Sequence, residues 1–285
     1  MNESAGEPGA RRPQEAPPLA VVTGASSGIG EAFARVAAEE GFATLLIARR
    51  AGRLEALARE LASRFGVPSR ALALDLAAPG APARVMAALE EAGAVPAVLV
   101  NNAGFGAVGD SVELDPAALR RMIDLNAGAL TELAVRIGRE MRDAGRGRIL
   151  NVASTAAFQS CPHLGVYGAT KAFVLSFSES LAEELRGTGV TVTALCPGPT
   201  ATEFGFVAGL ADDAPMEGVD LAKLERSAEA VARTGWRAMR SGRTVVIDGA
   251  GNAVLAHLAA LLPRALVRRI AGAALGRLRR RDAGA

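Results

Sequence analysis

Short apolar runs alternate with longer segments of helical periodicity along most of this 285-residue chain. Within the runs Val, Leu, Ile and Ala follow one another almost without polar interruption, which is typical of strands buried on both faces of a parallel sheet. The pattern therefore predicts a doubly wound α/β domain, with about seven parallel strands and helices on both faces. The predicted strands lie within residues 19–26, 43–49, 69–76, 97–104, 148–154, 190–198 and 243–249.

Helical segments follow the first six runs. They are predicted to extend to residue 40 and over 51–65, 82–93, 115–143, 165–186 and 227–240. Glycine comes directly after five of them, where a left-handed cap is expected. These glycines are Gly41, Gly66, Gly93, Gly145 and Gly187.

Both ends of the chain differ from its middle. Residues 1–18 carry four prolines and charges of both signs without an apolar core, which predicts a disordered arm and no secretory signal. Residues 19–249 contain no Pro/Ser-rich linker and are predicted to form one domain. Residues 250–285 form a basic extension with seven arginines against one aspartate, in a chain whose net charge is only +2. No run of 18 apolar residues is present, so no membrane-spanning helix is expected.

The cysteines and histidines are few. Cys161 and Cys196 lack CxxC spacing and are predicted to be buried, reduced thiols, which fits a cytosolic protein. Two histidines, His163 and His257, are too few for a His-rich metal site, and no metal is expected.

A glycine-rich turn, TGASSGIG at 23–30, follows the first predicted strand. Gly24 permits a tight turn, Gly28 lets the backbone approach a pyrophosphate, and Gly30 lets the next helix pack closely on the strand. The free N–H groups of that helix then face the phosphates. The spacing G-x-x-x-G-x-G meets the common dinucleotide fingerprint only in part, so a glycine-rich turn that binds nothing is the alternative.

Residues 24–28 of this turn also match G-x-S-x-G, the nucleophile elbow of α/β-hydrolases. Such an elbow needs a paired acid and histidine, and an earlier strand and loop for an oxyanion donor. Only a proline-rich arm precedes Leu19, and no acid is obviously paired with His163 or His257. The hydrolase interpretation is therefore the weaker one.

The second predicted strand ends in Ala48, Arg49 and Arg50. An NAD site places an acid here to bind the ribose 2′-hydroxyl, whereas guanidinium groups bind a 2′-phosphate through charge-assisted hydrogen bonds. The sequence therefore favours NADP(H) over NAD(H). Two solvated arginines at the start of a helix are the alternative.

Tyr167 is the only tyrosine in the chain, and Lys171 is one of two lysines. On a helix over 165–186 the two lie on one face, about one turn apart. A phenol has a pKa near 10, and an adjacent ammonium group is expected to lower that pKa toward neutrality, as an acid–base catalyst requires. A surface Tyr/Lys pair is the alternative.

Two further polar residues accompany this pair. Ser154 ends a predicted strand 13 residues before Tyr167, where its hydroxyl would polarise a substrate carbonyl. Asn126 lies within the predicted helix 115–143, and its alternative is an exposed helical asparagine.

Taken together, these motifs resemble the short-chain dehydrogenase/reductases of roughly 250 residues. The resemblance covers about residues 19–249 and rests on TGxxxGIG at 23–30, NNAG at 101–104, Asn126, Ser154, YxxxK at 167–171 and PGP at 197–199. It implies that Tyr167 is the acid–base, that Lys171 lowers its pKa and binds the nicotinamide ribose, and that Ser154 holds the substrate oxygen. It also implies that Asn126 positions a water that links Lys171 to solvent.

The resemblance further implies that Asp75 and Leu76 contact the adenine, and that Arg49 binds the 2′-phosphate. Ser27 departs from the pattern, because some NADP enzymes carry a second basic residue there. The cofactor-binding residues implied are Gly24, Ser26, Ser27, Gly28, Ile29, Gly30, Arg49, Arg50, Asp75, Leu76, Asn102, Ala103, Gly104, Tyr167, Lys171, Pro197, Gly198 and Thr200.

The expected function is an NADP(H)-dependent oxidoreductase that transfers hydride between nicotinamide and a carbonyl or secondary alcohol. A non-catalytic dinucleotide-sensing regulator is the alternative, although it has no need for Ser154, Tyr167 and Lys171 together. Family members are usually homodimers or homotetramers, and no nucleic-acid partner is expected. In the segment 199–220, Phe204, Phe206, Val207 and Leu210 fit either a lid over a lipophilic substrate or ordinary helix packing.

The basic extension predicts two helices within 252–281, separated at Pro263. Its apolar residues Val254, Leu255, Leu258, Leu261 and Leu262 suit packing on the body or on a partner subunit. Together with the arginines, they also suit an anionic membrane surface. The predicted location is cytoplasmic. Peripheral association with the inner face of the membrane is the more specific hypothesis.

Overall fold

The computed structural model describes residues 16–203 and 225–279, and its centre is a seven-stranded parallel sheet. The strand order is β3-β2-β1-β4-β5-β6-β9, which confirms the predicted doubly wound sheet. The strands are β1 (Leu19–Thr23), β2 (Ala43–Ala48), β3 (Ser69–Ala73), β4 (Val98–Asn101), β5 (Gly147–Val152), β6 (Val190–Cys196) and β9 (Val245–Ile247). A small second sheet pairs β7 (Thr200–Ala201) with β8 (Arg226–Ser227).

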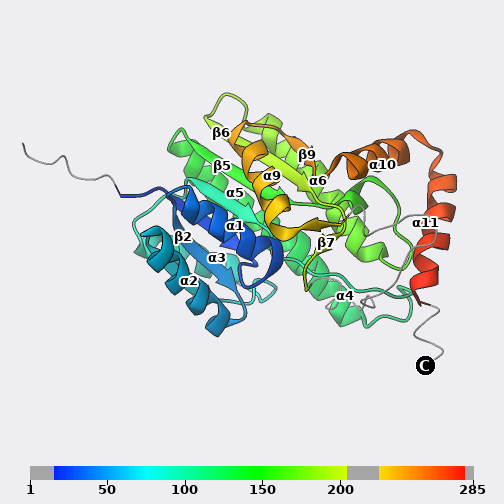
Figure 1. Ribbon diagram of the computed structural model, residues 1–285, viewed down its shortest axis with the longest axis horizontal. Helices are drawn as coiled ribbons and strands as arrows, with labels where there is room; N and C mark the ends of the chain where they lie inside the picture. Colours follow the sequence, from blue (N-terminus) through cyan, green and yellow to red (C-terminus); the bar gives the residue numbers. More distant parts are fainter. Residues whose placement is uncertain (1–15, 204–224, 280–285) are drawn as a thin grey trace, which may run out of the picture.

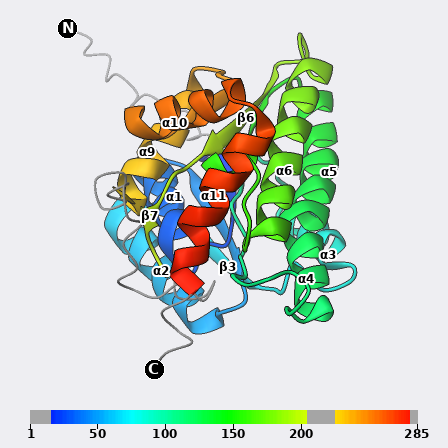
Figure 2. The same ribbon diagram turned by 90° about the vertical axis from the view of Figure 1, so that its right-hand side faces the viewer.

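Helices cover both faces of the sheet, because successive strand side chains point to opposite sides. On β1, Ala20 and Val22 join the core beneath α1, α2 and α9, whereas Val21 joins the core beneath α3, α5 and α6. Figure 2 shows these two helical layers on either side of the sheet. The helices are α1 (Gly28–Glu39), α2 (Ala51–Phe65), α3 (Ala81–Glu91), α5 (Leu130–Asp143), α6 (Gly165–Glu184) and α9 (Ala228–Arg240).

The helix ends follow the glycine pattern. All five glycines predicted as left-handed caps have positive φ, between +58° and +83°. These turns reverse the chain without a Cβ clash, which lets each helix return to the next strand.

The predicted helix 115–143 is present but is not regular throughout. It consists of α4 (Pro116–Ile123), a π-helical turn η1 (Asp124–Ala129) and α5. Asn126 lies in the π-helical turn and is fully buried. Because π-turns change the direction of side chains within a helix, they are common at functional positions.

The strand order reverses between β1 and β4, which are neighbours in the sheet although β2 and β3 lie between them in the chain. The connections leave these two strands in opposite directions, so a crevice opens at their carboxyl ends. This is where the glycine-rich turn after β1 and the NAG loop after β4 meet.

The predicted break at Pro263 is confirmed. The chain continues after β9 into α10 (Ala250–Leu261) and α11 (Arg264–Arg279). Ala256 of α10 and Val267 and Ala271 of α11 are buried, and Gly272 lies close to Pro162. Both helices lie at the end of the molecule toward which the strands point (Figure 1).

Some predictions lie outside the described residues. They concern most of the arm 1–18, the apolar residues of the segment 204–224, and the last two arginines of the extension. Within the described parts, no helix is long and apolar enough to cross a membrane. Cys161 and Cys196 are buried and free, as predicted.

A chain of buried polar side chains connects the sheet to α6, the helix that carries Tyr167 and Lys171. Asn101 of β4 donates a hydrogen bond to the Asn151 side chain of β5 (3.0 Å), and Asn151 donates to Ser178 Oγ of α6 (2.9 Å). Ser178 in turn donates to the Val174 carbonyl (2.6 Å). Since all three side chains are at most 2% exposed, an unmade hydrogen bond here is costly.

We expect Ser178→Ala to lower the free energy of unfolding by about 1–3 kcal/mol, because the Asn151 amide loses its buried acceptor. Ser180→Ala is the matched control: this exposed serine two residues further on bonds only to the Ser176 carbonyl, and its replacement should change stability by less than about 0.5 kcal/mol. Urea denaturation followed by circular dichroism measures both. Equal stability of the two variants would show that the polar chain does not hold α6.

Candidate active site

The turn between β1 and α1 is as compact as its glycines predict. Gly24 and Gly28 have φ of +68° and +57°. A Cβ on Gly30 would lie 2.3 Å from the Gly24 carbonyl oxygen, so only glycine fits where α1 meets the strand. Ile29 packs against the core beneath α1. Ser27 at the start of α1 makes no side-chain capping hydrogen bond, and the glycine-rich turn fits a dinucleotide pyrophosphate.

Thr23, which the sequence analysis did not single out, joins the turn to the NAG loop. Its hydroxyl accepts hydrogen bonds from the backbone N–H groups of Asn102 (2.9 Å) and Ala103 (3.0 Å). The Asn102 side chain donates to the Thr23 carbonyl (3.0 Å) and lies against Gly24 and Gly30. The ends of β1 and β4 are thus held together at the sheet's reversal point.

Lys171 is buried, with 5% of its surface exposed, and lies on α6 one turn from Tyr167. Its Nζ atom donates to the carbonyl oxygen of Val152 at the end of β5 (2.8 Å). The distance from Nζ to the centroid of the Tyr167 ring is 5.7 Å. The structure therefore brings the two side chains together, as the helical spacing predicts.

The prediction that the pKa of Tyr167 is lowered is wrong for the protein without a bound ligand. Burial raises the pKa of Tyr167 to about 12, and a hydrogen bond with Ser154 offsets only part of that rise. Burial also lowers the pKa of Lys171 to about 8. The reason is that burial disfavours the charged form of both groups.

Ser154 follows β5 and caps the 3-10 turn η2 (Thr155–Phe158). Its Oγ accepts a hydrogen bond from the Ala156 N–H (3.1 Å) and is also hydrogen bonded with Tyr167. Ser154 and Tyr167 therefore form one polar group at the carboxyl end of β5.

Asn126 is not an exposed helical asparagine. Its Oδ1 accepts from the Phe105 N–H (3.1 Å), and its Nδ2 donates to the Phe105 carbonyl (2.9 Å) and to Thr170 Oγ1 (3.2 Å). A Cβ on Gly104 would lie 2.9 Å from Asn126 Oδ1 and 3.5 Å from Lys171 Nζ. Asn126 thus lies beside Lys171 and holds the loop that follows β4.

The PGPT segment follows β6 at the same edge of the sheet. The Pro197 carbonyl accepts from the Thr155 N–H (2.9 Å), which ties this segment to the turn after Ser154. A Cβ on Gly198 would lie 2.2 Å from Asn252 Nδ2, and Thr200 begins β7. Asp75 and Leu76 follow β3, where Leu76 is buried and Asp75 forms an ion pair with Arg121 (2.9 Å).

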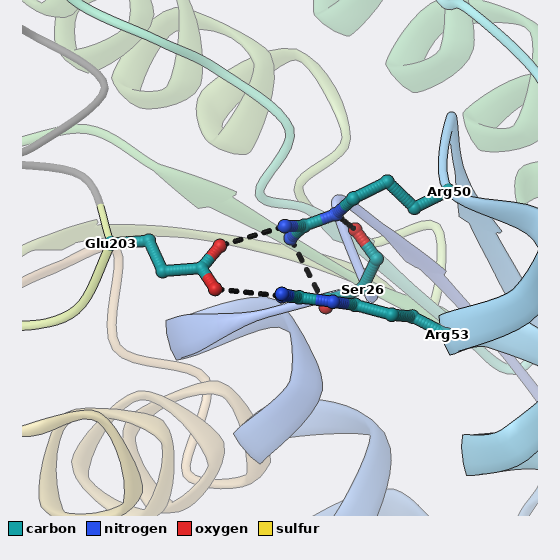
Figure 3. A network of polar contacts seen from close by, with 4 residues as sticks. All are labelled: Ser26, Arg50, Arg53 and Glu203. Atoms are coloured by element: carbon teal, nitrogen blue, oxygen red, sulfur yellow. Dashed lines mark hydrogen bonds and ion pairs between the residues drawn. The ribbon is translucent and has the colours of Figure 1, made fainter.

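An arginine cluster, which we define as Arg50 and Arg53, borders the glycine-rich turn (Figure 3). Arg50 donates to both the side chain and the carbonyl of Ser26, each at 3.1 Å. The Glu203 carboxylate pairs with Arg50 at 2.8 Å and with Arg53 at 2.7 Å. Arg49 is exposed. The sequence analysis missed Arg53 and Glu203, although Arg53 lies one helical turn after the two predicted arginines.

A hydrolase elbow would need Ser26 in contact with a histidine that is paired with an acid. Ser26 is 8% exposed and contacts Arg50. An acid does pair with one of the histidines, which the sequence did not predict: His163 contacts Asp110 (2.7 Å). His257 contacts the Ala253 carbonyl (2.6 Å). No group of His, Cys, Asp and Glu among the described residues could hold a metal ion.

Comparison with known proteins agrees with this arrangement. A family model described as "short chain dehydrogenase" matches residues 18–209. A sulfoacetaldehyde reductase of Chromohalobacter salexigens is 38% identical over 213 residues, which are 74% of this chain and 83% of the relative.

Two solved structures extend the likeness to the fold. A short-chain dehydrogenase from Sphingobium yanoikuyae in complex with NADPH has a TM-score of 0.77 at 34% identity, over 86% of this chain and 92% of the other. A short-chain dehydrogenase/reductase from Burkholderia phymatum in complex with NAD has a TM-score of 0.74 at 26% identity, over 85% and 92%. The chain therefore belongs to the short-chain dehydrogenase/reductases, enzymes that act on alcohol and carbonyl groups.

Proposed function

We propose that the chain is an NADP(H)-dependent oxidoreductase that interconverts a carbonyl and a secondary alcohol, with Tyr167 as the acid–base. The observation that carries this proposal is the hydrogen-bonded Ser154–Tyr167 pair beside the buried Lys171, at the carboxyl end of β5. A regulator that only senses a dinucleotide would have no need for this group. A bound nicotinamide dinucleotide would supply the hydride.

The protein's own groups have distinct tasks in the reduction of a carbonyl. Because its pKa is raised to about 12, Tyr167 is protonated at neutral pH and can donate its hydroxyl proton to the substrate oxygen. Ser154 orients that oxygen through its hydroxyl. Lys171, with a pKa of about 8, is mostly protonated at pH 7, so its charge stabilises the phenolate left behind.

Asn126 is proposed as a positioning residue. Its side chain holds Phe105 and Thr170, and through them the loop after β4 and the helix α6. The relay water that the family resemblance implies would bind the remaining lone pair of Asn126 Oδ1. Pro197, Gly198 and Thr200 would border the nicotinamide, and Asn102, Ala103 and Gly104 the adjacent ribose.

The preference for NADP(H) is assigned to the arginine cluster and Arg49. Arg50 is oriented by two hydrogen bonds to Ser26, so its guanidinium is already directed at the phosphate-binding turn. Two adjacent guanidinium groups suit a phosphate monoester and offer nothing specific to a ribose hydroxyl. On the adenine side, Asp75 and Leu76 lie at the end of β3.

A separate proposal concerns the extension. Val254, Leu255, Leu258, Leu261 and Leu262 are 41–82% exposed, so the described part of the chain leaves much of their apolar surface uncovered. The exposed arginines Arg264, Arg268 and Arg269 follow them directly. We propose that these residues dock on an anionic membrane surface, where arginines meet headgroups and leucines enter the acyl boundary. A partner subunit in a homodimer or homotetramer is the alternative occupant.

Replacement of Tyr167 by Phe should lower kcat for carbonyl reduction by more than about 100-fold, because only the transferable proton is lost. The affinity for NADPH, measured by fluorescence titration, should stay within about threefold. A panel of aldehydes and ketones assayed through NADPH absorbance supplies the substrate. Activity retained within about tenfold would rule out Tyr167 as the acid–base.

NADPH should bind at least about tenfold more tightly than NADH, and Arg50→Ala should remove most of this difference, because a charge-assisted phosphate contact is lost. Arg59→Ala, on the exposed side of the same helix α2, is the matched control and should change neither affinity. Equal affinities of the unmodified protein for both cofactors would contradict the assignment.

Membrane docking predicts that the full-length protein sediments with anionic vesicles at low salt and stays in solution with neutral ones. The double variant Leu258→Glu, Leu261→Glu should lose this binding, since it places charges where leucines would enter the lipid. Val112→Glu, at a site 95% exposed and remote in sequence, is the control. If the unmodified protein stays in solution with both kinds of vesicle, the membrane proposal fails. A smaller native mass for the double variant would then identify the partner subunit as occupant.

A further inference from the structure

The contact between Glu203 and the arginine cluster joins two distant parts of the chain. Arg50 and Arg53 lie at the start of α2, and Glu203 follows β7, about 150 residues later in the chain. One carboxylate oxygen accepts from Arg50 and the other from Arg53, so a single anion bridges both guanidinium groups (Figure 3). The two arginines hold the pKa of Glu203 at about 2, and the carboxylate is therefore charged at any physiological pH.

This bridge has the form of an anion site that is filled by the protein itself. The positive charges of Arg50 and Arg53 lie side by side because the Glu203 carboxylate pairs with both. Ser26 orients Arg50 independently of Glu203. A phosphate monoester offers the same paired oxygen acceptors with a charge of about −1.5 to −2 at pH 7. Such a group would therefore compete directly with the single negative charge of Glu203.

The contact is also exposed enough to exchange. The side chains of Arg50, Arg53 and Glu203 are 42%, 53% and 45% exposed. Solvent screens ion pairs of this kind, and they contribute little to folding stability. A hollow of about 280 Å³ adjoins the cluster and is lined in part by Ser26, Arg53 and Glu60, so a ligand has access from the solvent.

The side chain of Thr202, the residue before Glu203, lies against the glycine-rich turn. A Cβ on Gly28 would lie 3.0 Å from the methyl group of Thr202. Upstream, Thr200 pairs with Arg226 in the β7–β8 ladder. Glu203 thus lies two residues after a strand of the small β7–β8 sheet and outside the seven-stranded sheet.

We propose that Glu203 is a built-in competitor for the 2′-phosphate of NADP(H) and thereby limits the preference of the enzyme for that cofactor. The proposal rests on the assignment of the arginine cluster to the 2′-phosphate under the proposed function. NADP(H) must displace the carboxylate, whereas NAD(H) leaves the Glu203 bridge in place. The residue therefore acts on specificity and takes no part in the reaction.

The test is fluorescence titration of the full-length protein with NADPH and with NADH. Glu203→Gln should tighten NADPH binding by about three- to tenfold and leave NADH within about twofold. Glu39→Gln is the matched control, because it removes a carboxylate of similar exposure (47%) that pairs with Arg233 at the end of α1 remote from the glycine-rich turn. It should change either affinity by less than about twofold.

Glu203→Gln with unchanged NADPH affinity, or with an equal change for both cofactors, would overturn the proposal. Arg50→Ala separates this failure from that of the proposed function. If Arg50→Ala weakens NADPH binding while Glu203→Gln has no effect, the cluster holds the phosphate and Glu203 is not a competitor. If Arg50→Ala also leaves NADPH unchanged, the cluster is not the phosphate site and both assignments fail.

Discussion

The hydrogen bonds of Thr23 hold together the two strand ends on which the rest of the site depends. Its hydroxyl and carbonyl bind the NAG loop from β4, and the Asn102 side chain fills the space that Gly24 and Gly30 leave open. A Cβ at either glycine would push the loop away. The shape of the crevice at the reversal point therefore depends on the two glycines, on the Thr23 hydroxyl and on the Asn102 side chain.

The second part of the site consists of Tyr167 and Lys171, and its chemistry depends on the burial of these two ionisable side chains. Lys171 is kept under the carboxyl end of β5 by the Val152 carbonyl, and α6 is held to the sheet through Asn101, Asn151 and Ser178. In this position desolvation raises the pKa of Tyr167 and lowers that of Lys171. Tyr167 is consequently a protonated acid beside a cation, which suits the donation of a proton to a substrate oxygen.

Most of the fold was predictable from sequence, because the signals are local. The run 43–49 is apolar apart from Thr44 and the terminal Arg49, which is typical of a strand covered on both faces. Gly66 and Gly145 mark helix ends in the sequence, and both have positive φ in the structure. The YxxxK spacing places two side chains on one helical face regardless of what surrounds them. The π-helical turn at Asn126 was not predictable, since it depends on hydrogen bonds to Phe105 and Thr170 from other elements.

By itself, the sequence determined the order of strands and helices, the glycine-rich turn and the separation of the last two helices at Pro263. Only the tertiary structure decided the sign of the Tyr167 pKa shift, because that shift follows from desolvation by neighbours distant in the chain. It also brought Glu203 to Arg50 and Arg53 across about 150 residues, and it left Leu255, Leu258 and Leu261 of α10 47–82% exposed. Local patterns specify conformation, whereas burial and pairing of charges depend on which surfaces meet.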